Sequence, residues 1–257
     1  MSTARTFIHR SMATGLIVVA PSFTSLPKLS RIQSIVISQM GPSSVHVERT
    51  WGEFRDTVDL TFGHVQGGVH IEGTYRSSKG GELHYRAEVT RDEGHVEISD
   101  LQETFTVRLA KQDFRGHAYY KLVSIGFGDK EVAVDEQQLE RNLPQLVEIA
   151  EGLAQSRMLP LILDSHSLIQ AIQQKLGQRS AKRASFGFIQ EVLAAGCFWE
   201  CADCGVTALA YGLSISSLIS LCGATIGATC IIAAVEGRLA ALSIVLSCGD
   251  CLGCISS

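Results

Sequence analysis

Apolar and polar side chains alternate with a period of two from residue 31 to about residue 135. The alternation is clearest in segments 83–89 and 105–109, where every second side chain is apolar. Turn-forming sequences that contain glycine separate the segments, as at residues 79–81 and 92–94. Short alternating segments at even spacing predict an antiparallel meander that buries one face and exposes the other to water.

Helical spacing replaces this alternation in other parts of the chain. Residues 45–60 predict a helix packed on the sheet. Further along, apolar side chains recur every three or four positions through residues 139–153 and again through residues 162–176. We therefore predict two helices after the sheet, the second of which begins with Asp164 or Ser165 as its N-cap.

The character of the chain changes after the second of these helices. Residues 178–188 are basic, small and polar, which predicts a linker in which Lys182 and Arg183 are accessible to a protease. An ordinary solvated loop explains the same composition. Beyond the linker, residues 205–235 form a stretch of 31 residues without a charge, which exceeds the ~20 residues that span a bilayer core.

Charges are distributed unevenly along the 257 residues. The chain has 26 acidic and 22 basic residues, but only five acidic residues and one basic residue, Arg238, lie beyond Ala184. Because phosphate binding needs clustered lysine and arginine, this distribution argues against nucleic acid as a partner. A hydrophobic content of 46% excludes global disorder.

The cysteines are arranged as two triads that flank a middle pair. They are Cys197, Cys201, Cys204, Cys222, Cys230, Cys248, Cys251 and Cys254. All eight histidines precede them, so no mixed cysteine and histidine zinc finger can form within the tail alone. An even number of crowded cysteines is typical of exported proteins, in which disulfides persist.

Three chemistries fit this arrangement. Disulfides between the two triads would close loops of about 50 residues and stabilise the module by about 4 kcal/mol each, although the sequence does not define the pairing. Zinc could bind Cys201-x2-Cys204 together with Cys251-x2-Cys254, and Cys197-x3-Cys201-x2-Cys204 has the spacing of an iron–sulfur cluster motif. We favour disulfides, because the zinc connector is long and nearly chargeless, and because enzymes with that cluster need a large barrel downstream.

The first 30 residues are predicted to be a signal or leader segment. Arg5, His9 and Arg10 precede a short apolar run at residues 12–20. A charged segment followed by a short apolar one is typical of secretory signals, although the same run could equally form a buried strand. With the cysteine pattern, this segment predicts a protein that is secreted or membrane-associated.

No arrangement of residue types points to catalysis. His70, His84 and His95 fall on predicted strands near acidic residues, where such side chains usually cover the exposed face of a sheet. Asp164-x-His166 could form a general base and its orienting partner, but capping explains its position at a predicted helix start. We therefore expect no enzyme, no cofactor and no bound metal.

Three features of the tail occur together: a glycine-flanked opening at residues 196–205, a Cys-Gly-Ala-Thr-Ile-Gly-Ala-Thr-Cys centre at residues 222–230, and a Cys-Gly-Asp-Cys close at residues 248–251. In this layout the last 62 residues resemble the peptide of microhalocin precursors, which are antibiotics of the halocin C-eight type. The resemblance implies an exported antimicrobial peptide, a bacteriocin, that a protease releases from the C-terminus and that acts on target-cell membranes. It also implies partners, namely the export machinery, the protease and a leader domain that binds the peptide in self-immunity.

These features predict an α+β protein, with an N-terminal antiparallel sheet and helices followed by a small all-α, disulfide-stapled hydrophobic module. The expected domains are a signal or leader at residues 1–30, a pro-domain with an immunity role at 31–177, a linker at 178–188 and the peptide at 189–257. Two alternatives stay open: a membrane-anchored protein whose tail is a helical hairpin turning at Glu236–Arg238, and a zinc-binding interaction module.

Overall fold

The structure, a computed structural model, describes most of the chain between residues 34 and 225 and three short stretches beyond it. The described residues are 34–41, 43–65, 67–114, 117–135, 137–185, 198–225, 230–231, 248–249 and 251. The predicted signal or leader segment, residues 1–30, lies outside them, and so does the chain between Ser185 and Phe198.

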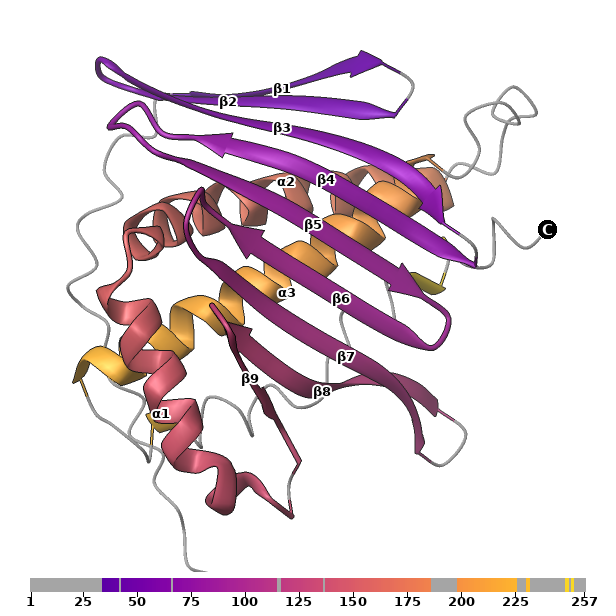
Figure 1. Ribbon diagram of the computed structural model, residues 1–257. Helices are drawn as coiled ribbons and strands as arrows, with labels where there is room; N and C mark the ends of the chain where they lie inside the picture. The colour runs from indigo at the N-terminus through magenta and orange to yellow at the C-terminus, as the bar shows by residue number, and fades with distance from the viewer. Residues whose placement is uncertain are drawn as a thin grey trace, which may run out of the picture. The chain divides into compact units, whose positions relative to one another are not determined.

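One antiparallel sheet forms the main layer of the described part of the chain, and each of its nine strands pairs with the next strand along the sequence (Figure 1). The strands are β1 (Ser34–Gly41), β2 (Ser44–Trp51), β3 (Phe54–Val65), β4 (Gly68–Arg76), β5 (Glu82–Thr90), β6 (Glu93–Ser99), β7 (Thr104–Phe114), β8 (His117–Phe127) and β9 (Lys130–Ala133). The predicted meander is therefore confirmed.

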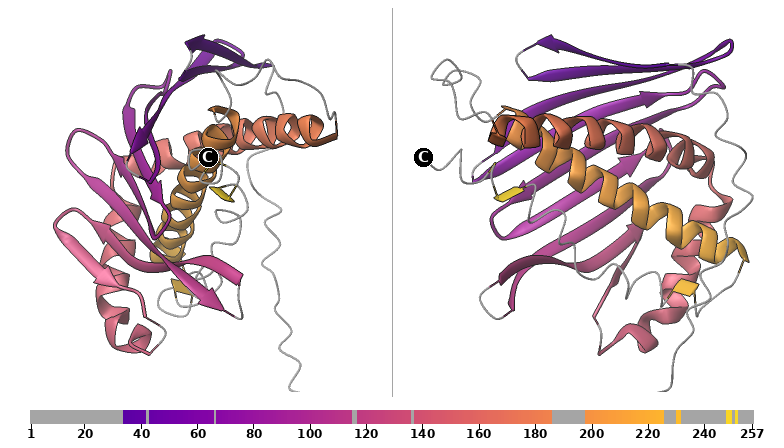
Figure 2. Two further views of the ribbon diagram at one scale, coloured as in Figure 1. Left: turned by 90° about the vertical axis from the view of Figure 1, so that its right-hand side faces the viewer. Right: turned by 180° about the vertical axis from the view of Figure 1, so that it is seen from behind.

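Three helices follow the sheet in the described part of the chain: α1 (Leu139–Gln155), α2 (Met158–Ser185) and α3 (Phe198–Thr225). Helix α3 runs diagonally across the middle strands, α2 lies beside α3, and α1 contacts α3 near β8 and β9. Figure 2 shows α2 and α3 on the same side of the sheet. This arrangement confirms the predicted α+β class.

The alternation along each strand sorts side chains between two faces, as strand β5 illustrates. Leu83 and Val89 are fully buried and point to the inner face, which the helices cover, whereas His84 and Arg86 are exposed on the outer face. Side chains on neighbouring strands share a face when their residues are paired, and Val89 pairs with Val69 of β4. The apolar set of every middle strand therefore reaches the same core.

The predicted helix at residues 45–60 is wrong, because this segment forms strands β2 and β3. The two strands meet at a tight turn in which Gly52 has a φ of 61°, a conformation that favours glycine. Val47 and Val58 are paired and fully buried on the inner face. The alternation was hidden because Arg49 and Asp56, both charged, occupy inner-face positions among the apolar residues.

Arg49 and Asp56 form a buried ion pair, with 3% and 1% of their surfaces exposed. The Arg49 guanidinium donates to Asp56 over 2.5 Å and to the Ser167 hydroxyl of α2 over 2.7 Å. Asp56 also accepts hydrogen bonds from the backbone and side chain of Ser78, each 3.0 Å long. Since Ser78 follows β4 and Ser167 lies on α2, this network ties α2 to three strands.

Helix α2 differs from its prediction at both ends. It begins at Met158, so Asp164 and Ser165 lie in its second turn and neither is its N-cap. It continues through Ser185, so residues 178–185, predicted as a linker, form its last turns instead. The physical reason is that these eight residues contain no glycine or proline and include alanine, arginine, lysine and glutamine, which are good helix formers. Residues 186–188 lie outside the described part.

Residues 32–257 make up one compact unit, and the apolar core runs without a break from the sheet through all three helices. Helix α3 has no charge after Asp203 and cannot bury this part all round alone, and the inner face of a single sheet also needs a cover. Packing α3 on that face meets both requirements.

Replacing Asp56 with asparagine is expected to lower the free energy of unfolding by about 3–5 kcal/mol, because Arg49 would keep a buried charge without its partner. Burial alone would raise the pKa of Asp56, but hydrogen bonds from Arg49 and Ser78 hold this pKa below its ordinary value. A carboxylate with a lowered pKa stabilises the fold above its unfolded pKa of about 4, and this stabilisation is lost as the pH falls through the folded value. Urea unfolding at several pH values measures both effects.

The matched control is Asp129→Asn, at an exposed turn, which is expected to change stability by less than about 0.5 kcal/mol. Below pH 4 the gap between Asp56→Asn and the unmodified chain should narrow. A gap that stays constant with pH would contradict the role given to the Asp56 carboxylate.

Candidate functional site

Helix α3 is the candidate functional element, because no residue of it after Asp203 is charged and it is long enough to span a bilayer. Its segment Cys201–Gly223, 23 residues long, is long and apolar enough to cross a membrane. In its most apolar window, 83% of the residues are buried inside the protein. A helix that is hydrophobic all round belongs either to a protein core or to a bilayer.

Glycines allow α3 to approach its neighbours closely. A Cβ atom at Gly205 would overlap the side chain of Ile71 on β4, and one at Gly212 would lie 2.6 Å from Val96 on β6. Gly223 makes the same kind of contact with the backbone of α1, at Ala150. Residues 205 and 212 are two helical turns apart and therefore lie on one face. This face sets how deeply α3 sits on the sheet.

Three of the four serines of α3 donate hydrogen bonds within the helix. The Ser216 and Ser217 hydroxyls donate to the carbonyl of Leu213 over 3.0 and 2.7 Å, and the Ser220 hydroxyl donates to the carbonyl of Ser216 over 2.5 Å. Buried polar groups that are satisfied inside one helix can enter an apolar medium with that helix. These three hydroxyls do not bind α3 to the sheet.

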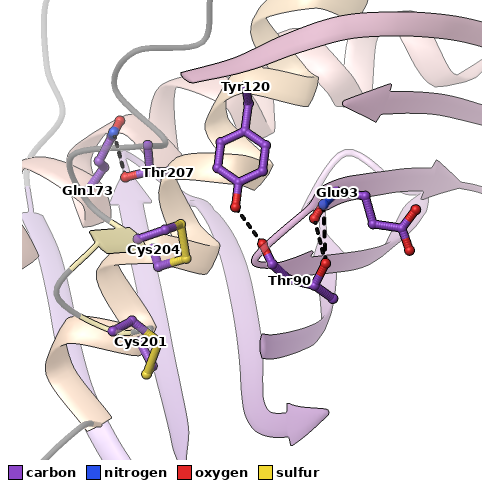
Figure 3. The surroundings of a disulfide bond; sticks show 9 residues. Thr90, Glu93, Tyr120, Gln173, Cys201, Cys204 and Thr207 are labelled. Carbon is purple, nitrogen blue, oxygen red and sulfur yellow. Dashed lines mark hydrogen bonds between the residues drawn. A yellow bond between two sulfur atoms is a disulfide. The ribbon is translucent and has the colours of Figure 1, made fainter. Parts of the chain in front are cut away.

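A polar contact does join α2 to α3 near the first turns of α3. The Gln173 amide donates to the Thr207 hydroxyl over 3.0 Å, as Figure 3 shows. Five aliphatic side chains of α3 that are 0 or 1% exposed belong to the same apolar core as α2 and the sheet, namely Val206, Leu209, Leu213, Ile215 and Ile219. The attachment of α3 to the rest of the protein is therefore mainly hydrophobic.

Two disulfides join the start of α3 to the end of the chain. Cys201 bonds to Cys251 and Cys204 bonds to Cys248, with Cα atoms 4.6 and 4.4 Å apart. The partner numbers fall as the α3 numbers rise, so the two segments run antiparallel and the bonds form consecutive rungs. The four cysteines are at most 2% exposed. The expected bridges between the two triads are thus present.

A third disulfide, Cys222–Cys230, closes a short loop at the other end of α3. No cysteine in the described part of the chain has a free thiol. The two remaining candidates, Cys197 and Cys254, lie outside the described residues. Three of the four cysteines that a zinc site would use, Cys201, Cys204 and Cys251, are in disulfides.

Tyr120 and the turn between β5 and β6 lie near Cys201 and Cys204, at the start of α3 (Figure 3). The Tyr120 hydroxyl of β8 donates to the carbonyl of Thr90, at the end of β5. Burial raises the pKa of Tyr120 to about 12, with a smaller contribution from the negative charge of Asp92. The tyrosine therefore stays neutral at physiological pH and acts as a hydrogen-bond donor that fixes the β5–β6 turn.

Three histidines of the sheet lie on its outer face, away from α3, beside carboxylates. His46 is 2.7 Å from Asp59, and His70 is 3.1 Å from Glu72. His84 lies 3.5 Å from Glu82. Among the residues that the structure describes, no group of three His, Cys, Asp or Glu side chains is arranged to hold a metal ion.

The other polar pair considered in the sequence lies inside α2. The Asp164 carboxylate is 3.4 Å from the Lys79 ammonium, and the His166 ring nitrogen is 3.0 Å from the Gln170 amide nitrogen. Lys182 and Arg183, the predicted processing residues, lie on the last turns of α2, and their side chains are outside the described residues. A protease needs extended backbone, so cleavage at this pair requires those turns to unwind.

Comparisons of the chain with protein-family models, with curated proteins and with solved structures found no match. Its function is therefore inferred from the geometry around α3. Sequence reasoning found the apolar segment and its cysteines but missed their place in the core. The glycines at 205, 212 and 223 were the available signal, because glycine inside a helix often marks a close approach of another element.

Replacing Gly212 with alanine is expected to destabilise the protein by about 1–3 kcal/mol, because the new methyl group would collide with Val96. Alanine favours helix over glycine by roughly 1 kcal/mol, so a helix without this contact would instead gain stability. The control is Gly249→Ala, where no other atom lies within 4 Å of the added Cβ. Thermal or urea unfolding measures whether the substitution lowers or raises the free energy of unfolding. A Gly212→Ala variant that is more stable than the unmodified chain would contradict the packing described.

Removing Cys201–Cys251 and Cys204–Cys248 together, with four serines, is expected to cost more stability than removing Cys222–Cys230 with two. The two rungs close the same long loop, so both must be removed to open it. Cys204 and Cys248 are 44 residues apart, whereas Cys222 and Cys230 are 8 residues apart. In the chain-entropy model, opening the long loop costs about 4 kcal/mol and opening the short one costs about 2.5 kcal/mol. Urea unfolding without reductant measures them, and equal losses would show that loop closure is not the main effect.

Proposed function

We propose that this chain is the precursor of an exported, disulfide-rich hydrophobic antimicrobial peptide, and that the sheet with α1 and α2, here called the cradle, shields the peptide until a protease releases it. The released peptide begins after α2 and contains α3, and it acts on the membranes of target cells. The observation that carries the proposal is that a helix of membrane length is enclosed in the core, with serine hydroxyls satisfied inside the helix.

Energetics favour a membrane as the destination of α3. Transferring the five buried aliphatic side chains of α3 named above into water would cost on the order of 10 kcal/mol. Entry into a bilayer avoids this cost, because the hydrocarbon replaces the inner face of the sheet as the apolar surroundings. The backbone of a helix is satisfied within itself, which a bilayer core requires.

The electrostatics of the peptide favour insertion over attraction to anionic lipid. The chain carries a single basic residue after Ala184, Arg238, against five acidic residues. Cationic amphipathic peptides use many basic residues to bind anionic headgroups, and this tail lacks them. We therefore propose that apolar transfer supplies most of the affinity for the target membrane.

The cradle also supports a role in self-immunity. Once α3 has left, the inner face of the sheet would expose the side chains that contacted it, among them Ile71 and Val96. An apolar surface of this kind binds the complementary helix again if the two meet. We propose that the cradle recaptures peptide near the producing cell, with the fit set by the glycine face of α3.

Export is supported by the disulfides. Disulfides form and persist in oxidising compartments, and the described part of the chain contains three. Oxidation before cleavage would lock the ends of the peptide together while α3 is still held in the cradle. Export machinery and a processing protease are then the partners that the proposal requires.

The second candidate function is a membrane-anchored protein, and the length and composition of α3 favour it as well. In that case the tail stays attached to the cradle, and α3 leaves the core to enter the membrane of its own cell. The two candidates predict different products, because only the bacteriocin leaves as a short peptide.

The intact mass of the product in the medium of producing cells tests the proposal. We expect a short C-terminal product whose mass rises on reduction by about 2 Da per disulfide. We also expect this product to release dye from vesicles of neutral lipid. Full-length chain alone in the medium, or full-length chain only in the membrane fraction, would contradict the proposal.

Processing at the predicted pair is tested by a variant in which Lys182 and Arg183 are both alanine. We expect the short product to disappear if the protease cuts at this pair. The matched control is Lys175→Ala, which removes an exposed basic residue of the same helix and should leave processing unchanged. An unchanged product mass from the double variant would place the cut elsewhere in the chain.

A further inference from the structure

The two edges of the sheet are built differently. Strand β9 ends one edge with only four residues, two of them charged, and its Lys130 lies 2.7 Å from Glu148 of α1. Strand β1 ends the other edge with eight residues and pairs with β2 alone in the described sheet. Short length, charge and a covering helix are the usual protections of a sheet edge. Strand β9 has all three, whereas β1 is long and uncharged and has no covering helix among the residues that the structure describes.

The composition of β1 also lacks the features that prevent pairing. Its sequence, Ser-Ile-Val-Ile-Ser-Gln-Met-Gly, contains no charge and no proline. Val36 is 57% exposed on the outer face, and Ile35 and Ile37 are only partly buried where they pack against the core. An edge strand offers backbone N–H and C=O groups from alternate residues to a new partner. Within the described part of the chain, no strand pairs with the outer edge of β1, and apolar side chains lie on both of its faces.

The sequence of β1 is complementary to itself. In an antiparallel pair, residues that lie opposite share a face, so two copies of β1 can meet about a two-fold axis at Val36. This register places Val36 opposite Val36 on the outer face and Ile35 opposite Ile37 on the inner face. Shifting the axis to residue 35 or 37 would instead set Val36 against a serine. The register centred on Val36 is thus the one that matches apolar residues best.

We propose that β1 is a dimerisation edge whose partner is β1 of a second copy of this chain, so that one continuous antiparallel sheet runs through both copies. The absence of charge favours an identical partner, because no charge on β1 selects a different one and no like charges meet across the axis. The nearest outer-face charge, Glu48 opposite Val36 on β2, is already paired with Arg55. The proposal is independent of the function proposed above.

A single cysteine at the axis tests the pairing in the full chain. Opposite residues in an antiparallel pair have Cα atoms about 4.5–5.5 Å apart, which is within the range of a disulfide. Val36→Cys is expected to form a covalent dimer under mild oxidation, seen as a doubled mass on a gel without reductant. Ser34→Cys is the control, because two copies of residue 34 would lie roughly 13 Å apart in this register.

A charge at the axis tests the same contact without new cysteines. Val36→Lys is expected to raise the dimer dissociation constant at least tenfold in sedimentation equilibrium, because two lysines would face each other, and Thr50→Lys on β2 is expected to change it less. Crosslinking of Val36→Cys but not Ser34→Cys supports the proposal. A Val36→Cys chain that stays monomeric would overturn the proposal. If the introduced thiol also fails to react with a thiol reagent, another part of the chain covers the edge of β1.

Discussion

The packing of α3 against the inner face of the sheet is the contact on which the rest of the fold depends. A nine-stranded meander with one apolar face is unstable in water unless that face is covered, and a helix as apolar as α3 is equally unstable unless it is enclosed. Ile71 and Val96 reach the helix backbone where glycine leaves room. The other elements are arranged around this contact: α2 lies along one side of α3, and α1 closes its end near Gly223.

The function proposed above also rests on this contact, because its apolar packing could be provided by a protein core or by a bilayer. Apolar packing holds α3 firmly in water but is not specific to protein, since a bilayer offers the same surroundings. The buried ion pair of Arg49 and Asp56 lies instead in the cradle, where it ties strands to α2. Polar contacts thus organise the part that would stay, and hydrophobic contacts hold the part that would leave.

The fold was predictable wherever side chains followed a regular period. The strands between residues 68 and 99 have buried apolar residues at every second position, so their alternation was visible in the sequence. Strands β2 and β3 were missed because Arg49 and Asp56 break the apolar pattern on the inner face. The end of α2 was missed because small, basic residues suit both loops and solvated helices. The place of α3 was missed because a chargeless segment fits a core and a membrane equally well, and its glycines indicate a close approach without naming the neighbour.

The pairing of Cys201 with Cys251 and of Cys204 with Cys248 has a consequence for how damage to the tail would be detected. Any backbone cut between residues 205 and 247 would leave both fragments covalently connected. A nicked tail would therefore migrate at nearly its original size until a thiol reagent separated the pieces. Under oxidising conditions, backbone cleavage in this region would not change the measured size of the molecule, and the two fragments would diffuse together.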